Sequence, residues 1–532
     1  MKMKRVSKLL TCVLSAAMIL SMTACGSTDN PAKPAGGDQA ASSSSQTVDT
    51  SGKVTLTIGS NADQVSTLDR FVNVGYGCDD LDYLIFDPLV NSDHMGTYSP
   101  GLATEWTQAD DYLSYTFTLR EGVKFADGSD FTSADVAATF ERIRDDKTLT
   151  DTGAWGDLES VETPDEKTAI IRLANPMPTF YDELYRVPII CKAALEADPE
   201  GYFLAPVGTG AFTLDSFDQL TGQCIMSRND SWWGWDEIDN TKTNVDIIDY
   251  QFIGEDTTRA SALRSGDMDI VLQLSADYKK DLEAEGFPML EVASDTHIHI
   301  EYNCGENSQF NNKDLRIALS EAIDREAIVS SVIGNGSAAT WPCPEGNVGY
   351  KADAEGYKYD PEHAKSLVEA SGYDGSEISM VYTSSSFIRA DEVAQAVQSM
   401  AAEVGLNVKL EPLEQAAFTD RRSSGSFDII LGAFASTAGD TQTEVAVIIG
   451  FDVFGSQYVN QEMSDLCAQV RTCGDKEERT KLIEQVFQIE MDEMAPFSYL
   501  YSPSYLCASA GNVSNYNVFA DGSGEYRFVQ MK

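Results

Sequence analysis

The chain has 532 residues, and its 84 acidic and 38 basic side chains give a formal net charge of −46 at pH 7. A surface this acidic repels nucleic acid and anionic lipid, so we expect neither nucleic acid nor a charged lipid surface as a binding partner. Hydrophobic residues make up 42% and aromatic residues 10%. This composition excludes a largely disordered chain and is sufficient for two large cores.

Residues 1–24 have the pattern of a secretion signal, with a cationic start followed by the apolar run Leu9–Met22. That run is shorter than the roughly 20 apolar residues that a membrane-spanning helix needs. The end of the segment, "MTAC", resembles the lipobox of bacterial lipoproteins, although Met22 replaces the usual leucine. The resemblance implies that Cys25 carries a lipid and becomes the mature N-terminus. The alternative is an ordinary cleaved signal with an incidental cysteine.

Residues 25–52 are rich in Gly, Ser, Ala, Pro and Thr and contain little that could be buried. Because this composition is typical of a flexible coil, we expect a tether there, and a coil of this length spans roughly 30 Å. Together with the signal and Cys25, the tether predicts a folded body held on the extracytoplasmic face of the cell membrane.

Strand and helix patterns alternate through the remaining chain. "VTLTIGS" from Val54, "YTFTL" from Tyr115 and "HIHIEYN" from His297 alternate with period two, as strands do. Helices are predicted at "TSADVAATFERI", where Thr132 and Asp135 form a capping box, and at "DPEHAKSLVEASG". Two more are predicted at residues 314–333 and 391–404 from their buried stripes. The mixture indicates α/β lobes.

Eight cysteines follow Cys25, with no CxxC pair and no zinc-ribbon spacing: Cys78, Cys191, Cys224, Cys304, Cys343, Cys467, Cys473 and Cys507. Disulfides are permitted in an exported protein, but the spacing does not determine a pairing, and a chain this long should fold without them. Motifs for a serine nucleophile, a zinc protease, a phosphate loop or an EF-hand are missing from the sequence. We therefore expect no enzyme and no cofactor.

Several long segments resemble the family 5 extracellular solute-binding proteins, the peptide- and nickel-binding receptors of ABC importers. The longest runs from Leu84 to Ile143, and it is followed in the expected order by "PVGTGAF" (206–212), "NDSWWG" (229–234) and "FNNKDLRIALSEAIDREAIVSSVIGNGSA" (310–338). "YDPEHAKSLVEASGY" and "YVNQEMSDLCAQV" continue the series. The resemblance covers nearly all of residues 53–532.

The resemblance implies a periplasmic-binding-protein-like α/β fold with two lobes joined by hinge strands. The first lobe would comprise residues 53–298, with an inserted subdomain at about 81–206, and the second lobe residues 299–498. Residues 499–532 would return to the first lobe. "HIHIEYN" and "APFSYLYSPS" would then be the crossing strands.

The resemblance also nominates two charged residues for the ligand. Arg389 falls where peptide-binding members place an arginine for the ligand carboxylate, a task that suits a planar guanidinium. Its alternative role is that of a surface residue near a helix start. Asp440 falls near the family's aspartate for the ligand ammonium, but the usual tryptophan is replaced by Phe434 and small residues. A simple turn role for Asp440 after Gly439 stays open.

Two further groups have both a functional and a structural interpretation. The loop Gly208, Thr209 and Gly210 could let the backbone approach a ligand closely, or could be a plain turn. Trp232, Trp233 and Trp235 are expected to pack and not to stack on a ligand.

The pattern His297-x-His299-x-Glu301 could chelate a divalent ion, because the three side chains share one strand face. Buried histidines with ordinary partners are favoured there, since the strand would be a lobe crossing. We expect no metal.

The sequence thus predicts a monomeric, membrane-anchored receptor that captures oligopeptides or dipeptides by lobe closure and delivers them to the permease and ATPase of an ABC importer. Two alternatives stay open. The same kind of receptor could bind a metal chelate, an oligosaccharide or another small solute, or the protein could be a peptide sensor or chaperone without a role in transport.

Overall fold

The computed structural model describes residues 52–532 apart from 62–64, 73–75, 151 and 239–241. The signal segment, Cys25 and nearly all of the tether lie outside the described residues. Within the described part, most strands belong to three large sheets, and short two-stranded pairs join β2 (Val90–Ser92) to β3 (Tyr98–Pro100), β20 (Val513–Ser514) to β23 (Gln530–Met531), and β21 (Asn517–Val518) to β22 (Gly524–Glu525).

The first large sheet has seven strands, in the order β12 (Met289–Ala293), β19 (Ser504–Ser509), β11 (Ile270–Val271), β1 (Thr55–Ser60), β10 (Ile247–Phe252), β9 (Cys224–Arg228), β8 (Phe212–Phe217). The central strand β1 runs parallel to both of its neighbours, and the outer strands are antiparallel. Helices α1 (Tyr76–Ile85), α5 (Gly234–Glu237), α6 (Asp256–Ser265) and α7 (Lys279–Glu285) belong to this lobe, called lobe 1 below.

The segment expected as an inserted subdomain contains a four-stranded antiparallel sheet, β4 (Ala103–Gln108), β5 (Ser114–Leu119), β7 (Thr168–Leu173), β6 (Leu158–Asp165). It also contains α2 (Ser133–Asp145), α3 (Phe180–Leu184) and α4 (Lys192–Ala197). Its buried residues form one continuous hydrophobic cluster with those of the seven-stranded sheet, from Leu56 through Phe117 to Val529. The segment is therefore fused into the core of lobe 1.

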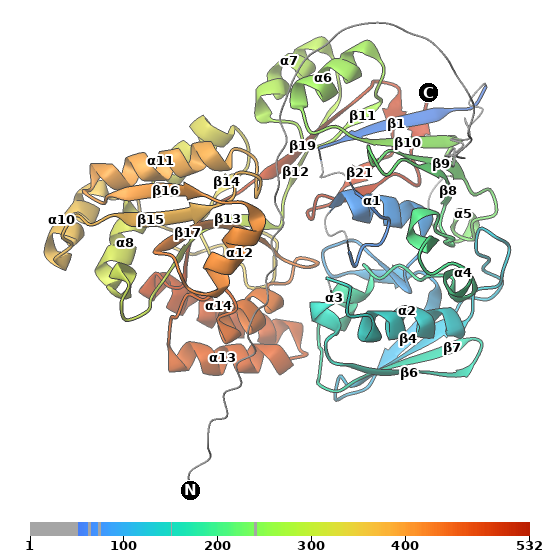
Figure 1. Cartoon of the computed structure of the whole chain (residues 1–532), viewed down its shortest axis with the longest axis horizontal. Coiled ribbons are helices and arrows are strands. Elements are labelled where there is room, and N and C mark those ends of the chain that lie inside the picture. Colours follow the sequence, from blue (N-terminus) through green and yellow to red (C-terminus); the bar gives the residue numbers. More distant parts are fainter. Residues whose placement is uncertain (1–51, 62–64, 73–75, 151, 239–241) are drawn as a thin grey trace, which may run out of the picture. The chain divides into compact units, whose positions relative to one another are not determined.

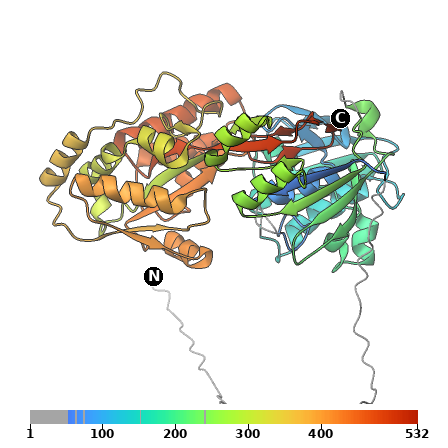
Figure 2. The same ribbon diagram turned by 90° about the horizontal axis from the view of Figure 1, so that it is seen from above.

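The third sheet has six strands, in the order β14 (Ser337–Ala338), β18 (Phe497–Ser502), β13 (Thr296–Tyr302), β17 (Ile429–Ala435), β15 (Ile378–Tyr382), β16 (Val408–Pro412). Helices of this lobe, lobe 2, are α8 (Lys313–Ala322), α9 (Arg325–Ala327), α10 (Pro361–Ser371), α11 (Ala390–Glu403), α12 (Gln415–Ser423), α13 (Gln461–Thr472) and α14 (Lys476–Glu493). Figures 1 and 2 show lobe 2 in yellow to red and lobe 1 mainly in blue to green.

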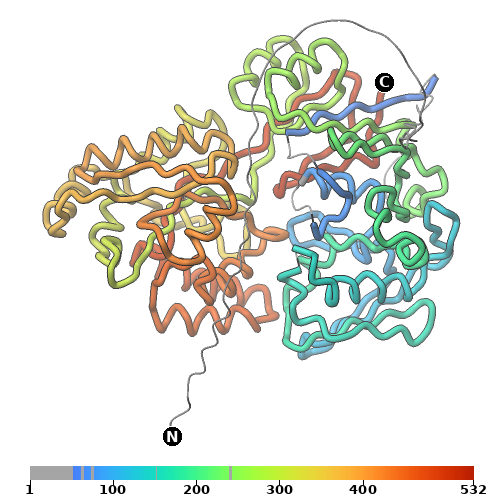
Figure 3. Tube along the Cα trace, viewed as in Figure 1, coloured from blue at the N-terminus to red at the C-terminus, as the bar shows by residue number. Residues whose placement is uncertain are grey.

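The chain passes between the two sheets twice, and the tube in Figure 3 can be followed through both passages. It leaves β12 and enters lobe 2 at Thr296, which already pairs with β17, and it returns through Pro503 between β18 and β19. "HIHIEYN" and "SYLYS" are thus strands of lobe 2, and the crossings are the short segments beside them. The sequence placed lobe 2 at 299–498, a few residues inside these limits.

The local signals in the sequence have clear structural counterparts. The Thr132 N–H donates to Asp135 Oδ2 at 2.9 Å, which closes the expected capping box, and Val136, Phe140 and Ile143 of α2 are buried. Asp360 accepts from the His363 N–H, and Gly372 ends α10 with a φ of 79°. The helix expected over 314–333 is divided, because α8 ends at Ala322 and Asp324 caps a new turn at Arg325. All eight cysteines of the described chain are free thiols.

Candidate functional site

A cavity of about 1000 Å³ lies between the lobes, next to the crossings. Lobe 1 contributes Gln273 to Ala276 after β11, the start of α1, and Tyr185 and Arg186 after α3. Lobe 2 contributes the end of β17 with the following residues, and the loop before α11. Its volume is at the upper end of the range usual for small-molecule sites, roughly 300–1,000 Å³. A cavity with walls from two lobes favours a solute that is enclosed when the lobes approach each other.

Arg389 lies in the lobe 2 wall of this cavity, at the residue before α11. Its backbone is left-handed, with a φ of 61°. The guanidinium donates to the Val332 carbonyl and to Ser275 Oγ, and it forms an ion pair with Asp277. Ser275 and Asp277 belong to lobe 1, so Arg389 reaches across the opening. The structure therefore places Arg389 at the cavity, already paired with a carboxylate.

Phe434 lies on β17 and also lines the cavity. It is half-buried, and its ring centroid lies 5.8 Å from that of His297 on the neighbouring strand β13. An apolar ring at this position offers contact area to a solute without a charge preference.

Asp440 is placed differently from the expectation. It is 5% exposed, and its Oδ2 accepts from Arg479 Nη2 at 2.6 Å and from Nε at 3.2 Å. Its Oδ1 accepts from the Gln442 N–H at 2.9 Å. Asp440 does not line the cavity in the described chain. The local geometry supports its alternative role, a turn aspartate that anchors α14 through Arg479.

The loop Gly208–Gly210 also lies away from the cavity lining. A Cβ at Gly208 would lie 1.9 Å from the Ile85 carbonyl oxygen, and one at Gly210 would lie 2.4 Å from the Leu84 oxygen. These glycines are needed for close packing against the end of α1, because any side chain would collide with its backbone. The loop therefore packs closely against the protein's own backbone, which supports its interpretation as a plain turn.

Three of the sequence motifs that carry the resemblance meet at one buried carboxylate, Asp87. Its Oδ2 accepts from Thr209 Oγ1 at 2.8 Å and from Trp233 Nε1 at 2.8 Å, and Trp232 Nε1 lies 3.2 Å from both of its oxygens. Burial raises the pKa of Asp87, and Arg527 with the three hydrogen-bonding side chains opposes this rise. The motifs around 87, 206–212 and 229–234 are thus explained by a structural cluster in lobe 1.

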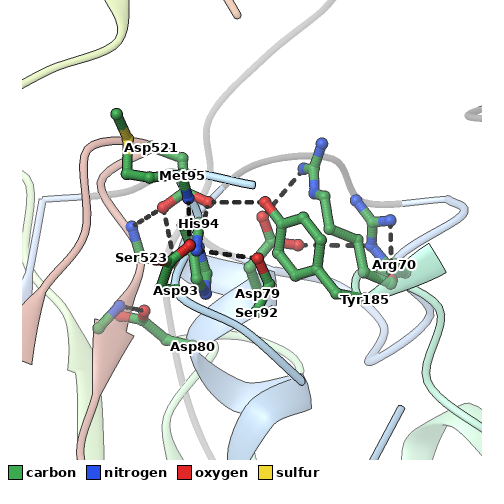
Figure 4. A network of polar contacts seen from close by, with 12 residues as sticks. Arg70, Asp79, Asp80, Ser92, Asp93, His94, Met95, Tyr185, Asp521 and Ser523 are labelled. Carbon is green, nitrogen blue, oxygen red and sulfur yellow. Dashed lines mark hydrogen bonds and ion pairs between the residues drawn. The ribbon is translucent and has the colours of Figure 1, made fainter. Parts of the chain in front are cut away.

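A second polar network, which the sequence did not reveal, reaches the cavity at Asp521 (Figure 4). His94 Nδ1 lies 2.7 Å from Asp521 Oδ2, and the Tyr185 hydroxyl donates to the same oxygen at 3.4 Å. The other oxygen accepts from the Ser523 N–H at 3.0 Å. Nearby, Asp79 pairs with Arg186 at 3.1 Å. These groups come from distant parts of the chain, so no short motif marks them.

The comparisons with known proteins identify the family. The model of the bacterial extracellular solute-binding proteins, family 5, matches residues 97–448. The probable D,D-dipeptide-binding periplasmic protein DdpA of Escherichia coli K12 is 30% identical over 487 residues, which cover 87% of this chain and 91% of DdpA. The chain belongs to this family.

Solved structures of family 5 proteins show the same fold. NikA from Brucella suis, in complex with Fe(III)-EDTA, superposes with a TM-score of 0.80 at 21% identity, covering 90% of this chain and 100% of NikA. DppA from Helicobacter pylori, in complex with the peptide STSA, gives 0.74 at 23% identity, covering 90% and 98%. The expected fold, a periplasmic-binding-protein-like α/β architecture with two lobes, is confirmed. This family 5 chain is a solute-binding receptor of the ABC-importer class, and the relatives are named as binding proteins.

The histidines of β13 in this receptor are buried side chains. His297 Nε2 lies 3.4 Å from Glu444 Oε1, and Glu301 pairs with Arg422 at 2.9 Å. Burial, His297 and Arg422 lower the pKa of His299 well below its ordinary value. No group of His, Cys, Asp and Glu side chains suited to a metal ion occurs among the residues that the structure describes.

Proposed function

We propose that this family 5 receptor binds short peptides in the cavity between its lobes and delivers them to the permease and ATPase of an ABC importer. The observation that carries the proposal is a 1000 Å³ cavity with charged groups of both signs on opposite walls. Arg389 stands on lobe 2, and Asp521 stands on lobe 1. A zwitterionic, extended solute complements such a cavity, because each charged end can meet an opposite charge.

The relatives support a peptide over other solutes. DdpA is named for D,D-dipeptides, and solved family structures hold the peptide STSA, the dipeptide Met-Leu and a nonapeptide. Other relatives are named for heme or glutathione, and one structure holds agropinic acid. The second candidate is therefore a non-peptide solute, such as a metal chelate, in the same cavity.

Solute binding would shift the equilibrium between the open and the closed arrangement of the two lobes. A solute that contacts both walls stabilises the closed form by its difference in affinity for the two forms, and closure presents both lobes to the permease. We propose that the receptor acts as a monomer. The described residues include no helix with the length and apolar character needed to cross a bilayer.

We place the receptor on the extracytoplasmic face of the cell membrane, held by a lipid on Cys25. The support is the sequence pattern of residues 1–25 together with the extracellular class of the family. Replacement of Cys25 by Ser should move the protein from the membrane fraction to the soluble extracellular fraction and abolish incorporation of labelled fatty acid. A membrane-bound Cys25→Ser variant would contradict the anchor.

Native mass spectrometry of the purified protein tests the ligand class. Peptides of a few residues should be retained and should exchange with added peptide. Retention of a metal chelate, a sugar or heme without any peptide would overturn the peptide proposal and favour the second candidate.

A further inference from the structure

Among the described residues, the charged side chains of the cavity wall are few, and each has an ionic partner within the protein. Four charged residues of the described chain line the cavity: Asp79, Arg186, Arg389 and Asp521. Asp79 accepts from Arg186 at 3.1 Å and lies 3.4 Å from Arg70. Arg389 is paired with Asp277. Asp521 pairs with His94 within lobe 1 at 2.7 Å, and its side chain is 18% exposed.

The surroundings of Asp521 hold it in one position as an anion. It lies in the turn between β21 and β22, where Ser523 Oγ donates to Oδ1 at 2.5 Å, and His94 fixes Oδ2. His94 is in turn stacked on Phe519, with ring centroids 3.7 Å apart. Burial raises the pKa of Asp521, but His94 and Ser523 more than offset this, so that the pKa lies well below its ordinary value. A fixed carboxylate is a preorganised partner for a cationic group.

A second carboxyl group lies behind Asp521 without a partner of its own. Asp295, in the crossing between β12 and β13, is 2% exposed, and neither of its carboxyl oxygens has a hydrogen-bond partner among the described residues. Its N–H donates to the Ala520 carbonyl at 2.9 Å, and its own carbonyl accepts from the Ser436 N–H at 3.3 Å. Its backbone is thus held between the turn of Asp521 and Ser436, and both Asp521 and Ser436 line the cavity.

A buried carboxyl group without a hydrogen-bond partner is costly to ionise. Burial raises the pKa of Asp295 well above its ordinary value, and the negative charge of Asp521 adds to this effect. A cation bound against Asp521 would offset the negative charge of Asp521. It would therefore lower the pKa of Asp295 and favour the ionised form of its carboxyl group. The hydroxyl of Tyr185, which points at Asp521, completes the polar wall (Figure 4).

We propose that the cavity binds the cationic group of its solute, an ammonium or a guanidinium, at a subsite formed by Asp521, with Asp295 behind it and Tyr185 beside it. This inference rests on the proposed function and deepens it, because it assigns the positive end of the solute to the lobe 1 wall. Arg389, on lobe 2, then receives the negative end. The cation is either the α-ammonium of a peptide or a basic side chain.

Isothermal titration calorimetry on the full-length protein in detergent tests the subsite with three sets of probes. The first set is alanine peptides of two to five residues, the second is their N-acetylated forms, and the third is acetylated peptides with one lysine. Asp521→Asn should weaken the first set at least about tenfold, equivalent to about 1.4 kcal/mol, and should not weaken the acetylated forms, which lack the cationic end. A similar loss for the lysine peptides would assign the site to a basic side chain as well.

Two further variants keep the test decisive if Asp521→Asn folds poorly. Asp295→Asn and Tyr185→Phe should each weaken cationic probes several-fold and spare the acetylated forms. The matched control is Asp281→Asn, an exposed carboxylate of α7 that does not line the cavity. If the ratio of the affinities for free and acetylated peptides is the same in the wild type and in Asp521→Asn, the subsite is overturned. The proposal that the cavity captures peptides would still stand.

If the wild type binds none of the probes, the proposed peptide function fails, and the subsite is then judged on whatever solute is retained during purification. A cationic solute that native mass spectrometry finds several-fold depleted in Asp521→Asn would support the subsite. A solute without a cationic group, or one retained equally by both proteins, would overturn it.

Discussion

Arg389 of lobe 2 and Asp277 of lobe 1 form an ion pair at the edge of the cavity. The same guanidinium donates to Ser275 Oγ at 3.3 Å, so one side chain links the two lobes by two contacts. Asp277 is largely solvent-exposed, with 69% of its side chain accessible, whereas Arg389 is 26% exposed. In the proposed function, the carboxylate of Asp277 occupies the position at Arg389 that a solute carboxylate would take.

Replacement of Asp277 by Asn should free Arg389 for the solute. Exposed ion pairs contribute about 0–1 kcal/mol, so we expect peptides with a free C-terminus to bind up to about fivefold more tightly. Amidated peptides should be unaffected, because they do not compete for Arg389. Calorimetry with both peptide forms measures the difference, and Asp281→Asn is the control. Weaker binding of both forms would show instead that the ion pair helps to hold the lobes together around the solute.

Replacement of Arg389 by Ala should have the opposite effect on the same peptides. Loss of a charged hydrogen-bond donor to a carboxylate costs about 2–5 kcal/mol when the pair is buried, so the affinity for free peptides should fall at least about thirtyfold. Amidated peptides should lose much less. Arg389→Lys is the matched variant, since it keeps the charge without the planar fork. An equal loss for free and amidated peptides would remove Arg389 from carboxylate recognition.

The fold could be predicted from the sequence because local signals and family motifs agree along most of the chain. The capping box at Thr132 and the helix end at Gly372 depend on residues a few positions apart, and both occur as expected. The break in the helix expected over 314–333 was missed, since its apolar stripe continues past Asp324, although Asp324 is itself a typical N-cap.

The site was harder to predict, because a sequence motif that resembles a family can serve packing as well as ligand binding. The motif around Gly208 and Thr209 packs against the end of α1 and against Asp87, and Asp440 forms a buried pair with Arg479. Asp521 reaches the cavity only because a C-terminal hairpin lies beside His94, more than four hundred residues away in sequence. No periodicity or spacing contains that information.

Replacement of Asp440 by Asn should lower stability and leave solute discrimination unchanged. The variant removes the carboxylate that accepts two hydrogen bonds from the buried Arg479 guanidinium, and loss of one partner of a buried ion pair typically costs about 3–5 kcal/mol. Thermal melts of the ligand-free protein should show a clearly lower midpoint, whereas the ratio of affinities for free and acetylated peptides should stay that of the wild type. A stable Asp440→Asn variant that no longer distinguishes the two peptide forms would return Asp440 to the binding site.

Asp182 should make the protein less stable as the pH rises towards neutrality. Burial raises the pKa of Asp182 to about 7, and the nearby negative charge of Asp440 adds to this, while the hydrogen bond from Tyr98 and the charge of Arg479 oppose it. The folded protein therefore binds a proton that the unfolded chain releases at a lower pH, near its ordinary value of 3.8. Because the folded state holds more protons between these two pKa values, the contribution of Asp182 to the free energy of unfolding falls as pH rises through that window.

Urea unfolding of the wild type and of Asp182→Asn, at pH 5 and at pH 7.5, measures this contribution. The asparagine keeps an acceptor for the Tyr98 hydroxyl and cannot ionise. The variant should therefore be stabilised relative to the wild type, and by more at pH 7.5 than at pH 5, because the contribution of Asp182 falls across the whole window from pH 3.8 to about 7. Glu301, whose pKa burial also raises to about 7 despite its pairing with Arg422, stays in both proteins and cancels in the comparison. A difference between the two proteins that is the same at both pH values would show that Asp182 is ionised throughout this range.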